Sequence, residues 1–368
     1  MPRKTHATDA KSASVLIIDA APRDILFLEM NEFIKQGLSI TLNLNRVADP
    51  EKVKQTYKNQ IHKYVNFNPF NTAALLQQIM ENSGYEVLKS RLNIPFTREI
   101  IEKATASHLK NPLKIIAQAG VGTSHIDSIA AADHGVAVTN TPGSNANAVA
   151  EFVILQTLSL ARNICFHNNE CHQQHWTKEK LGFSLELSGK TLGIVGAGNI
   201  AQELIKKAKA LGMHVLVFGS SRFNPTIAAS LGVEYSKDLP HLLKNSDIVS
   251  IHVPLTPETN NLFSEAQFKM MKKNSLLINT SRGGIVDEHA LAKILQSEDS
   301  NIAGVAIDTH EQEGEKFISP LIGMKNALLT PHIAGSTPDA LKCAALKCVE
   351  NIVKLLREST PTLIKSAL

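Results

Sequence analysis

Three short segments in the last third of the chain carry side chains that suit the chemistry of a keto acid. They read NTSRGGIVD from Asn279, DTHEQEG from Asp308 and TPHIAGST from Thr330, and each follows a short apolar run. A guanidinium can hold a carboxylate and polarise a carbonyl, and an imidazolium can protonate the alkoxide that forms. A carboxylate beside the imidazole fixes its tautomer. Arg, Glu and His in these segments therefore predict hydride-type reduction of a 2-keto acid.

A glycine turn earlier in the chain predicts the hydride carrier. The letters GAGNIA at 196–201 follow the apolar run 192–195 and open a helical pattern over Ile200–Leu211, which Gly212 ends. Glycines allow the backbone to approach a pyrophosphate, and the helix N-terminus supplies free N–H groups to it. We expect Gly196, Gly198, Asn199 and Ile200 to bind a dinucleotide here.

The end of the next strand bears on which dinucleotide binds. In a domain that is specific for NAD, an Asp or Glu about 20 residues after the glycines accepts a hydrogen bond from the ribose 2′-hydroxyl. Gly219 stands there in this chain, and Ser220, Ser221 and Arg222 follow it. No carboxylate repels a 2′-phosphate, and Arg222 could pair with one. We therefore expect a preference for NADPH over NADH, the alternative being that Arg222 is only a solvated loop residue.

The elements around these motifs predict parallel α/β architecture, because short β-branched runs alternate with longer amphipathic stretches. Six buried strands are expected in the cofactor-binding part and four in a weaker series before it. Long helices are expected at Ala146–Arg162 and from Thr337-Pro338 to about Leu356. The expected strands are Leu192–Val195, Val215–Phe218, Ile248–Val253, Leu276–Asn279, Ile302–Ile307 and Ala327–Thr330, with Val15–Asp19, Ile40–Leu44, Lys114–Ala117 and Val136–Thr139 in the weaker series.

The chain resembles the D-isomer-specific 2-hydroxyacid dehydrogenases from about residue 89 to residue 356. The resemblance rests on AGVGTSHID, NTPGSNANAVAE, GKTLGIVGAGNIA, INTSRGGIVDE and LLTPHIAGST, which occur in the family's order. It implies that Arg282 binds the substrate, that His332 is the acid/base and that Glu313 is its partner. It also implies that Asp308 holds the nicotinamide carboxamide, and it implies further cofactor and substrate contacts. Those cofactor contacts are Pro254, Thr280, Ser281 and Gly335, and the substrate contacts are the N–H groups of Val121 and Gly122.

The resemblance also implies two Rossmann-like domains and a dimer. We expect a doubly wound cofactor domain at 147–336, inserted into a discontinuous flavodoxin-like substrate domain at 14–146 plus 337–368. Residues 1–13 are expected to be a disordered tail, and residues 45–80 hold an insertion relative to compact family members. In the family the helix at 146–162 helps to build a dimer interface, so we expect a homodimer.

The substrate stays open at this point. A glyoxylate or hydroxypyruvate reductase fits the NADPH-leaning loop, and D-3-phosphoglycerate dehydrogenase is the alternative. Lys89 and Arg91 could meet a substrate phosphate, although Gln118 stands where an Arg would help. An alternative of another class is a nucleotide-sensing scaffold, as in the family's transcriptional co-repressors.

Composition adds few constraints. The formal net charge of +4 over 368 residues gives no reason to expect nucleic acid as a partner, and no apolar run suggests a membrane partner. Four cysteines without a CxxC pair fit a reducing cytoplasmic setting. His167, Cys171 and His175 share a helical spacing, but without a ligand knuckle we expect no metal.

Overall fold

The computed structural model describes residues 12–179, 182–220 and 223–358. The chain divides into two compact units. Unit 1 comprises the residues up to Ser144 together with those from Pro338 onward, and unit 2 comprises Asn145–Thr337. The expected tail lies almost wholly outside the described residues, as do Ser221 and Arg222.

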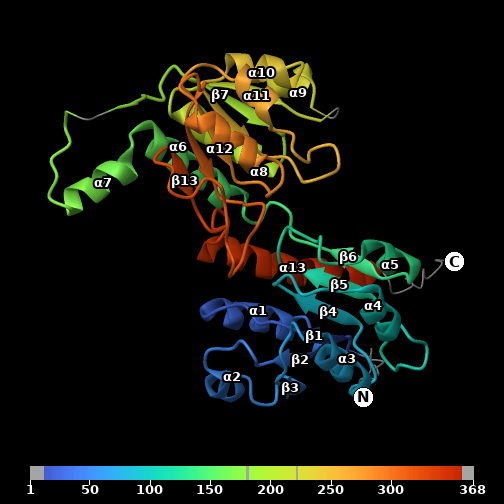
Figure 1. Ribbon diagram of the computed structural model, residues 1–368. Coiled ribbons are helices and arrows are strands. Elements are labelled where there is room, and N and C mark those ends of the chain that lie inside the picture. Colours follow the sequence, from blue (N-terminus) through green and yellow to red (C-terminus); the bar gives the residue numbers. More distant parts are fainter. Residues whose placement is uncertain (1–11, 180–181, 221–222, 359–368) are drawn as a thin grey trace, which may run out of the picture. The chain divides into compact units, whose positions relative to one another are not determined.

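Unit 1 is built on a six-stranded parallel sheet in the order β3-β2-β1-β4-β5-β6. Helices α1 and α13 pack on one face of this sheet, and α3, α4 and α5 pack on the other (Figure 1). Its elements are β1 (Ser14–Ile17), α1 (Asp24–Lys35), β2 (Ser39–Asn43), α2 (Pro50–Thr56), β3 (Lys63–Val65), α3 (Thr72–Glu81), β4 (Val87–Ser90), α4 (Arg98–Ala104), β5 (Ile115–Gln118), α5 (Ser128–Asp133), β6 (Ala137–Thr139) and α13 (Pro338–Glu358).

The segment 45–80, in which an insertion was expected, supplies an edge strand. β3 pairs with β2 through Thr41–Lys63, Leu42–Tyr64 and Asn43–Val65, and α3 follows it. Without β3 the strand order would be the expected flavodoxin-like one. β3 thus adds one edge strand to the five-stranded flavodoxin-like order of unit 1.

Unit 2 is built on a seven-stranded parallel sheet in the order β13-β12-β11-β10-β7-β8-β9. The order reverses beside β7, so the crevice at the carboxyl ends of β7 and β10 is the ligand position of a doubly wound sheet. Its elements are α6 (Ala146–Ala161), α7 (Ile164–His172), β7 (Thr191–Val195), α8 (Asn199–Ala210), β8 (His214–Phe218), α9 (Pro225–Leu231), β9 (Glu234–Tyr235), α10 (Leu239–Asn245), β10 (Ile248–Ile251), α11 (Glu265–Met270), β11 (Ser275–Asn279), α12 (Glu288–Gln296), β12 (Ile302–Ile307) and β13 (Ala327–Leu329).

Two aliphatic cores hold unit 2 together, one on each face of its sheet. Helices α6 and α8 cover one face, where Ala150, Val153, Leu204 and Ile205 are buried. Helices α10, α11 and α12 cover the other face (Figure 1). The sheet between them is covered on both sides, which is why its strands read as continuous apolar runs.

Three strands were not predicted, and the predicted ends of β1, β2, β10 and β13 lie one or two residues too late. β4 carries a lysine and a serine although every residue in it is buried, so its apolar run is too short to recognise. β3 has three residues and β9 has two, both exposed in β9. β10 ends at Ile251, two residues before the predicted end.

Helix α7 and helix α6 bend by 64° at the break between them. Within the described residues no single helix is long and apolar enough to cross a membrane, and only this bent pair passes that test of length and composition.

Candidate active site

The glycine turn after β7 forms a cradle for an anion. Gly196 has a φ of +108°, and a Cβ there would lie 2.5 Å from the carbonyl oxygen of His252. Its N–H donates to the Phe218 carbonyl over 2.7 Å, which fixes the turn between β7 and β8. Helix α8 starts after Gly198 with no side-chain cap, and open space surrounds the Gly198 Cα. Gly198 and Asn199 are exposed, so the first N–H groups of α8 face outward and can receive a phosphate.

Position 219, at the end of β8, has no room for a side chain. A Cβ on Gly219 would lie 2.7 Å from Phe223 Cβ and 3.1 Å from Ala197 Cβ. This crowding explains why a glycine stands where an NAD-reading acid is usual. Ser220 is exposed, while its neighbours Ser221 and Arg222 lie outside the described residues.

A buried asparagine shapes the loop that carries Arg282. Asn279 Oδ1 accepts hydrogen bonds from the N–H and Oγ of Ser281, and Asn279 Nδ2 donates to the Arg282 carbonyl. The Arg282 side chain is exposed, and its Nη1 donates to the Ser281 carbonyl over 2.6 Å. Gly283 follows, and a Cβ there would lie 1.8 Å from the His310 carbonyl oxygen. Two loops therefore touch backbone to backbone behind Arg282.

Asp308 ties the end of β12 to the loop that carries His332. Its buried carboxylate accepts from Thr330 Oγ1 at 2.6 Å, from the Ile333 N–H at 3.0 Å and from the Ala334 N–H at 2.9 Å. Its carbonyl accepts from the His332 N–H at 2.8 Å. The Asp308 carboxylate is thus used inside the protein, and the resemblance gave no sign of this bracing.

His332 and Glu313 meet in the structure. Glu313 Oε2 lies 3.0 Å from His332 Nδ1, and Glu313 Oε1 accepts the His310 N–H at 3.2 Å. Both side chains are close to half exposed, so their interaction contributes little to stability. Because the carboxylate accepts at Nδ1, the Nε2 atom of His332 is left for a substrate. His332 also has a φ of +53°, a conformation that its hydrogen bond to Asp308 helps to hold.

The remaining cofactor candidates surround this edge of the unit 2 sheet. Thr280 is buried, and its Oγ1 is among the buried side-chain atoms of the described residues that have no hydrogen-bond partner. Pro254 is exposed, and its carbonyl accepts from Thr259 Oγ1. Gly335 packs against Asn145, whose Nδ2 would lie 2.7 Å from a Cβ at that position.

The substrate candidates of unit 1 divide into two groups. Val121 and Gly122 lie partly exposed in the loop after β5, and the Val121 carbonyl accepts from Asn140 Nδ2. Lys89 requires a correction: its side chain is completely buried, and its Nζ lies 2.7 Å from Glu29 Oε1 on α1. An ammonium so enclosed does not face a substrate. The sequence could not reveal this, because Glu29 is 60 positions away from Lys89.

The metal-like residues near α7 do not gather. α7 ends at His172, so His175 lies beyond it and interacts with Glu170 at 3.3 Å. His167 instead bonds Thr177 Oγ1. Among residues 12–179, 182–220 and 223–358, no three His, Cys, Asp or Glu side chains are placed to hold a metal ion.

Two residues near the candidate catalytic set were missed from the sequence. Asn279 gives a weak signal as a polar residue at the end of an apolar strand. His310 gives no signal in the sequence, because no role was expected for it between Asp308 and Glu313. It is nevertheless buried and contacts the loops that carry Arg282 and His332.

Comparison with known proteins yields one family. The family model described as D-isomer specific 2-hydroxyacid dehydrogenase, NAD binding domain, matches residues 154–334. The D-3-phosphoglycerate dehydrogenase of Methanocaldococcus jannaschii is 38% identical over 74% of this chain and 50% of its own length. The glyoxylate reductase of Thermococcus litoralis is 36% identical over 78% of this chain and 84% of its own length. The chain thus spans half the length of the first relative and most of the second.

A solved structure supports the same relationship. The crystal structure of a glyoxylate reductase from Paecilomyes thermophila is similar with a TM-score of 0.71 and 25% identity. The similarity covers 85% of this chain and 94% of that chain. The fold of this chain is therefore similar to that of a solved member of the same family.

Proposed function

The chain belongs to the D-isomer specific 2-hydroxyacid dehydrogenase family, and we propose that it reduces a small, unphosphorylated 2-keto acid of the glyoxylate or hydroxypyruvate type. The observation that carries the proposal is the 3.0 Å contact between His332 Nδ1 and Glu313 Oε2, close to an exposed Arg282. This set has the acid, the orienting base and the anion clamp that C2 reduction requires.

A nicotinamide cofactor suits the residues present. Gly196 leaves room for a close backbone approach, and the uncapped start of α8 offers its N–H groups to the pyrophosphate. When bound, this cofactor supplies the hydride for C2. Gly198, Asn199 and Ile200 would hold the pyrophosphate at the turn. The groups that would line the rest of the cofactor are Pro254, Thr280, Ser281, Asp308 and Gly335.

The proton and the carboxylate are handled by the chain's own residues. His332 gives the Nε2 proton to the carbonyl oxygen of the substrate as the C2–O bond becomes an alcohol, and it keeps the Nδ1 proton that faces Glu313. Glu313 stabilises the imidazolium before that transfer. Arg282 of unit 2 holds the substrate carboxylate. Asp308 keeps the His332 loop in place through its three hydrogen bonds.

Two observations favour an unphosphorylated acid. The ammonium of Lys89 is enclosed and paired with Glu29, so it adds no free positive charge for a phosphate. Gln118 is buried and donates to the Arg91 carbonyl instead of presenting a cation. D-3-Phosphoglycerate dehydrogenation is the second candidate, because a relative that carries that name is 38% identical.

NADPH is the cofactor that we propose over NADH. Gly219 has no space for an acid beside Ala197 and Phe223, so nothing at that position repels a 2′-phosphate. Ser220 is exposed and can offer its hydroxyl to the phosphate. Ser221 and Arg222 follow it in the sequence and add a second hydroxyl and a guanidinium. The ratio of kcat/KM for the two cofactors tests this, and a clear preference for NADH would refute it.

The same assay decides the substrate. Glyoxylate, hydroxypyruvate, 3-phosphohydroxypyruvate and pyruvate are each tested with NADH and NADPH. Turnover of glyoxylate or hydroxypyruvate supports the proposal, and turnover of the phosphorylated acid alone supports the second candidate.

His332→Ala should abolish reduction and leave cofactor binding, followed by fluorescence titration, nearly unchanged. Tight cofactor binding without turnover of any acid would favour a nucleotide-sensing scaffold.

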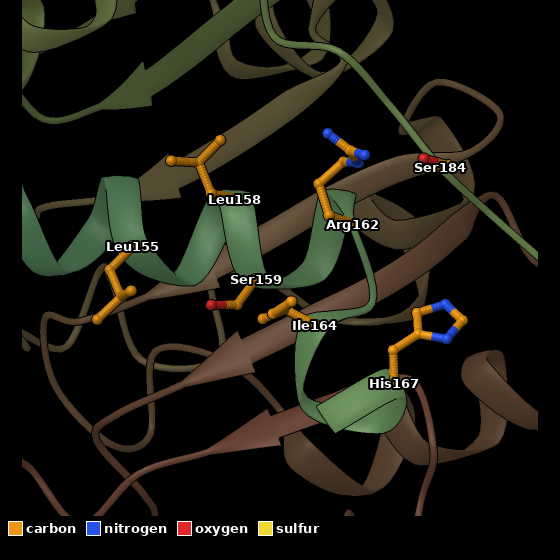
Figure 2. Close-up of a pocket in the computed structure, with 7 residues that line it drawn as sticks. All are labelled: Leu155, Leu158, Ser159, Arg162, Ile164, His167 and Ser184. Atoms are coloured by element: carbon orange, nitrogen blue, oxygen red, sulfur yellow. The ribbon is translucent and has the colours of Figure 1, made fainter. Parts of the chain in front are cut away.

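A homodimer in the cytoplasm completes the proposal. Leu155 and Leu158 on α6 and Ile164 on α7 are exposed apolar side chains. They line a hollow of about 560 Å³, which Figure 2 shows at the junction of the two helices. An exposed apolar surface of this kind favours association. Light scattering should give twice the chain mass, and Leu158→Glu should shift it toward the monomer. The four cysteines are unpaired, as a reducing compartment requires.

A further inference from the structure

The three loops that carry Arg282, Glu313 and His332 all contact His310. The His310 N–H donates to Glu313 Oε1 at 3.2 Å, and the His310 carbonyl oxygen packs where a Cβ on Gly283 would be, next to Arg282. The imidazole Nε2 lies 3.0 Å from the Thr330 carbonyl oxygen, two residues before His332. His310 is only 5% exposed, so it lies buried beneath the exposed pair of Glu313 and His332 and contacts all three loops.

Both ring nitrogens of His310 face acceptors. The Thr330 carbonyl oxygen can only accept, so Nε2 carries a proton. Nδ1 lies 3.7 Å from Glu288 Oε1, at the start of α12. A lone pair on Nδ1 would then point at a carboxylate, which is repulsive, whereas a proton there is attracted. The surroundings therefore favour the doubly protonated ring.

The carboxylate of Glu288 is held in its ionised form by donors. Glu288 Oε1 accepts from the Glu311 N–H at 3.0 Å, and Oε2 accepts from Ser319 Oγ at 2.5 Å. Burial opposes the charge, but the interactions with His310, Ser319 and Glu311 outweigh it and lower the pKa of Glu288. In turn, Glu311 Oε1 accepts a hydrogen bond from the Glu288 N–H, so two hydrogen bonds join α12 to the loop.

The remaining groups around the ring are compatible with a positive charge. Phe317 packs against the ring, with the two ring planes inclined by 66° and the centroids 4.7 Å apart. Burial is the largest influence on the pKa of His310 and lowers it. The Glu288 carboxylate and the Thr330 carbonyl, with the charge of Glu313, outweigh burial and raise this pKa above its usual value. The acidic groups that face His310 are thus Glu288 from α12 and Glu313 from its own loop.

We propose that His310 is a charged positioning residue, which is paired with Glu288 and holds the Glu313 loop against the His332 loop. The inference rests on the proposed function insofar as Glu313 and His332 are the acid/base pair. The charged ring donates a hydrogen bond to the Thr330 carbonyl on one side and forms an ion pair at 3.7 Å with Glu288 on the other, where Nδ1 has no hydrogen-bond partner among the described residues. Its backbone N–H is thereby aimed at Glu313 Oε1, which leaves Oε2 for His332. A neutral ring would keep only one of the two anchors.

The charge can be measured without any turnover. Protein with 15N-labelled histidine is titrated by NMR, because the two nitrogens of an imidazolium and of a neutral imidazole give distinct shifts. One of the 14 histidines should stay doubly protonated at a pH at which the exposed ones are neutral. Glu288→Gln should abolish that signal, and His289→Gln, a change at an exposed neighbour on α12, should leave it. Absence of such a histidine in the wild-type spectrum overturns the proposal, whatever the enzyme's substrate.

The positioning role is tested by kinetics on hydroxypyruvate. His310→Gln can still donate to the Thr330 carbonyl but carries no charge, and Glu288→Gln keeps the volume of the carboxylate. Each should lower kcat about tenfold or more, because a small misplacement of a catalytic group is costly, and neither should change the cofactor Kd appreciably. His289→Gln should match the wild type in every parameter. Wild-type kcat in both variants, or a loss confined to cofactor binding, would overturn the positioning role. Should His310→Gln fail to fold, Glu288→Gln and the wild-type NMR titration still decide.

Discussion

Glu29→Gln should destabilise unit 1 severely, because it leaves the ammonium of Lys89 buried and unpaired. Both side chains are 0% exposed, and Nζ lies 2.7 Å from Glu29 Oε1. Nζ also donates to the neutral Asp19 carbonyl at 3.3 Å, and the charge of the Asp19 carboxylate stabilises the ammonium less than that of Glu29 does. Breaking a buried ion pair from one side costs about 3–5 kcal/mol. For a unit of this size that corresponds to a fall of about 6–20 °C in Tm.

The assay is thermal and urea unfolding of a matched set. The double variant Glu29→Leu with Lys89→Met removes both charges and should recover most of the loss, since an apolar pair of similar volume replaces an ion pair at little cost. Glu32→Gln is the control: it lies on the same helix, and its pair with Lys35 at 3.6 Å is partly exposed. That variant should cost less than about 1 kcal/mol.

Two results would contradict the reasoning. One is a Glu29→Gln variant as stable as Glu32→Gln, which would mean that Lys89 reaches water or deprotonates at little cost. The other is a double variant as unstable as the single one, which would place the cost in packing and not in charge. Either result would also reopen Lys89 as a phosphate ligand.

Further predictions concern unit 2. Gly283→Ala places a Cβ 1.8 Å from the His310 carbonyl oxygen, so it should cost about 1–3 kcal/mol or more in urea unfolding and lower kcat; an unchanged urea midpoint would contradict the close approach. Burial lowers the pKa of His252 to about 4. Below about pH 6.5 this imidazole is protonated in the unfolded chain but stays neutral in the native state. The free energy of unfolding therefore falls as the pH drops from about 6.5 to 4, by about 2 kcal/mol at pH 5. His252→Gln should lack this part of the loss between pH 7 and pH 5, and an identical pH dependence would refute it. Glu313→Gln should lower kcat at least about tenfold while the Kd of NADPH, measured by fluorescence, stays unchanged; equal kcat would remove Glu313 from the orientation of His332.

The strands of unit 2 could be predicted well, and those of unit 1 less well. A strand covered on both faces reads as an unbroken apolar run, as residues 276–278 do within β11. β4 is equally buried, but Lys89 and Ser90 interrupt its run. Periodicity detects apolar burial only, so a strand that buries an ion pair escapes it.

The residue types at the strand ends indicated Arg, Glu and His chemistry, and the resemblance to the family selected the individual residues. Glu313 was chosen over Glu311 because the family's Glu lies five positions after the Asp, which is Asp308 in this chain. What these residues contact was not predictable. Asp308 proves to brace the backbone at Ile333 and Ala334, a task that no local pattern indicates.

The sequence by itself predicted the class of chemistry that we propose, through residue types at strand ends and a glycine turn before a helix. Only the tertiary structure decided which charges are free. Lys89 and Glu29 lie 60 positions apart and form an ion pair inside a core, and His310 meets Glu288 of the preceding helix, α12. The physical reason is that the state of a charge depends on its desolvation and its partners. Both are properties of neighbours in space, which long-range strand and helix packing brings together.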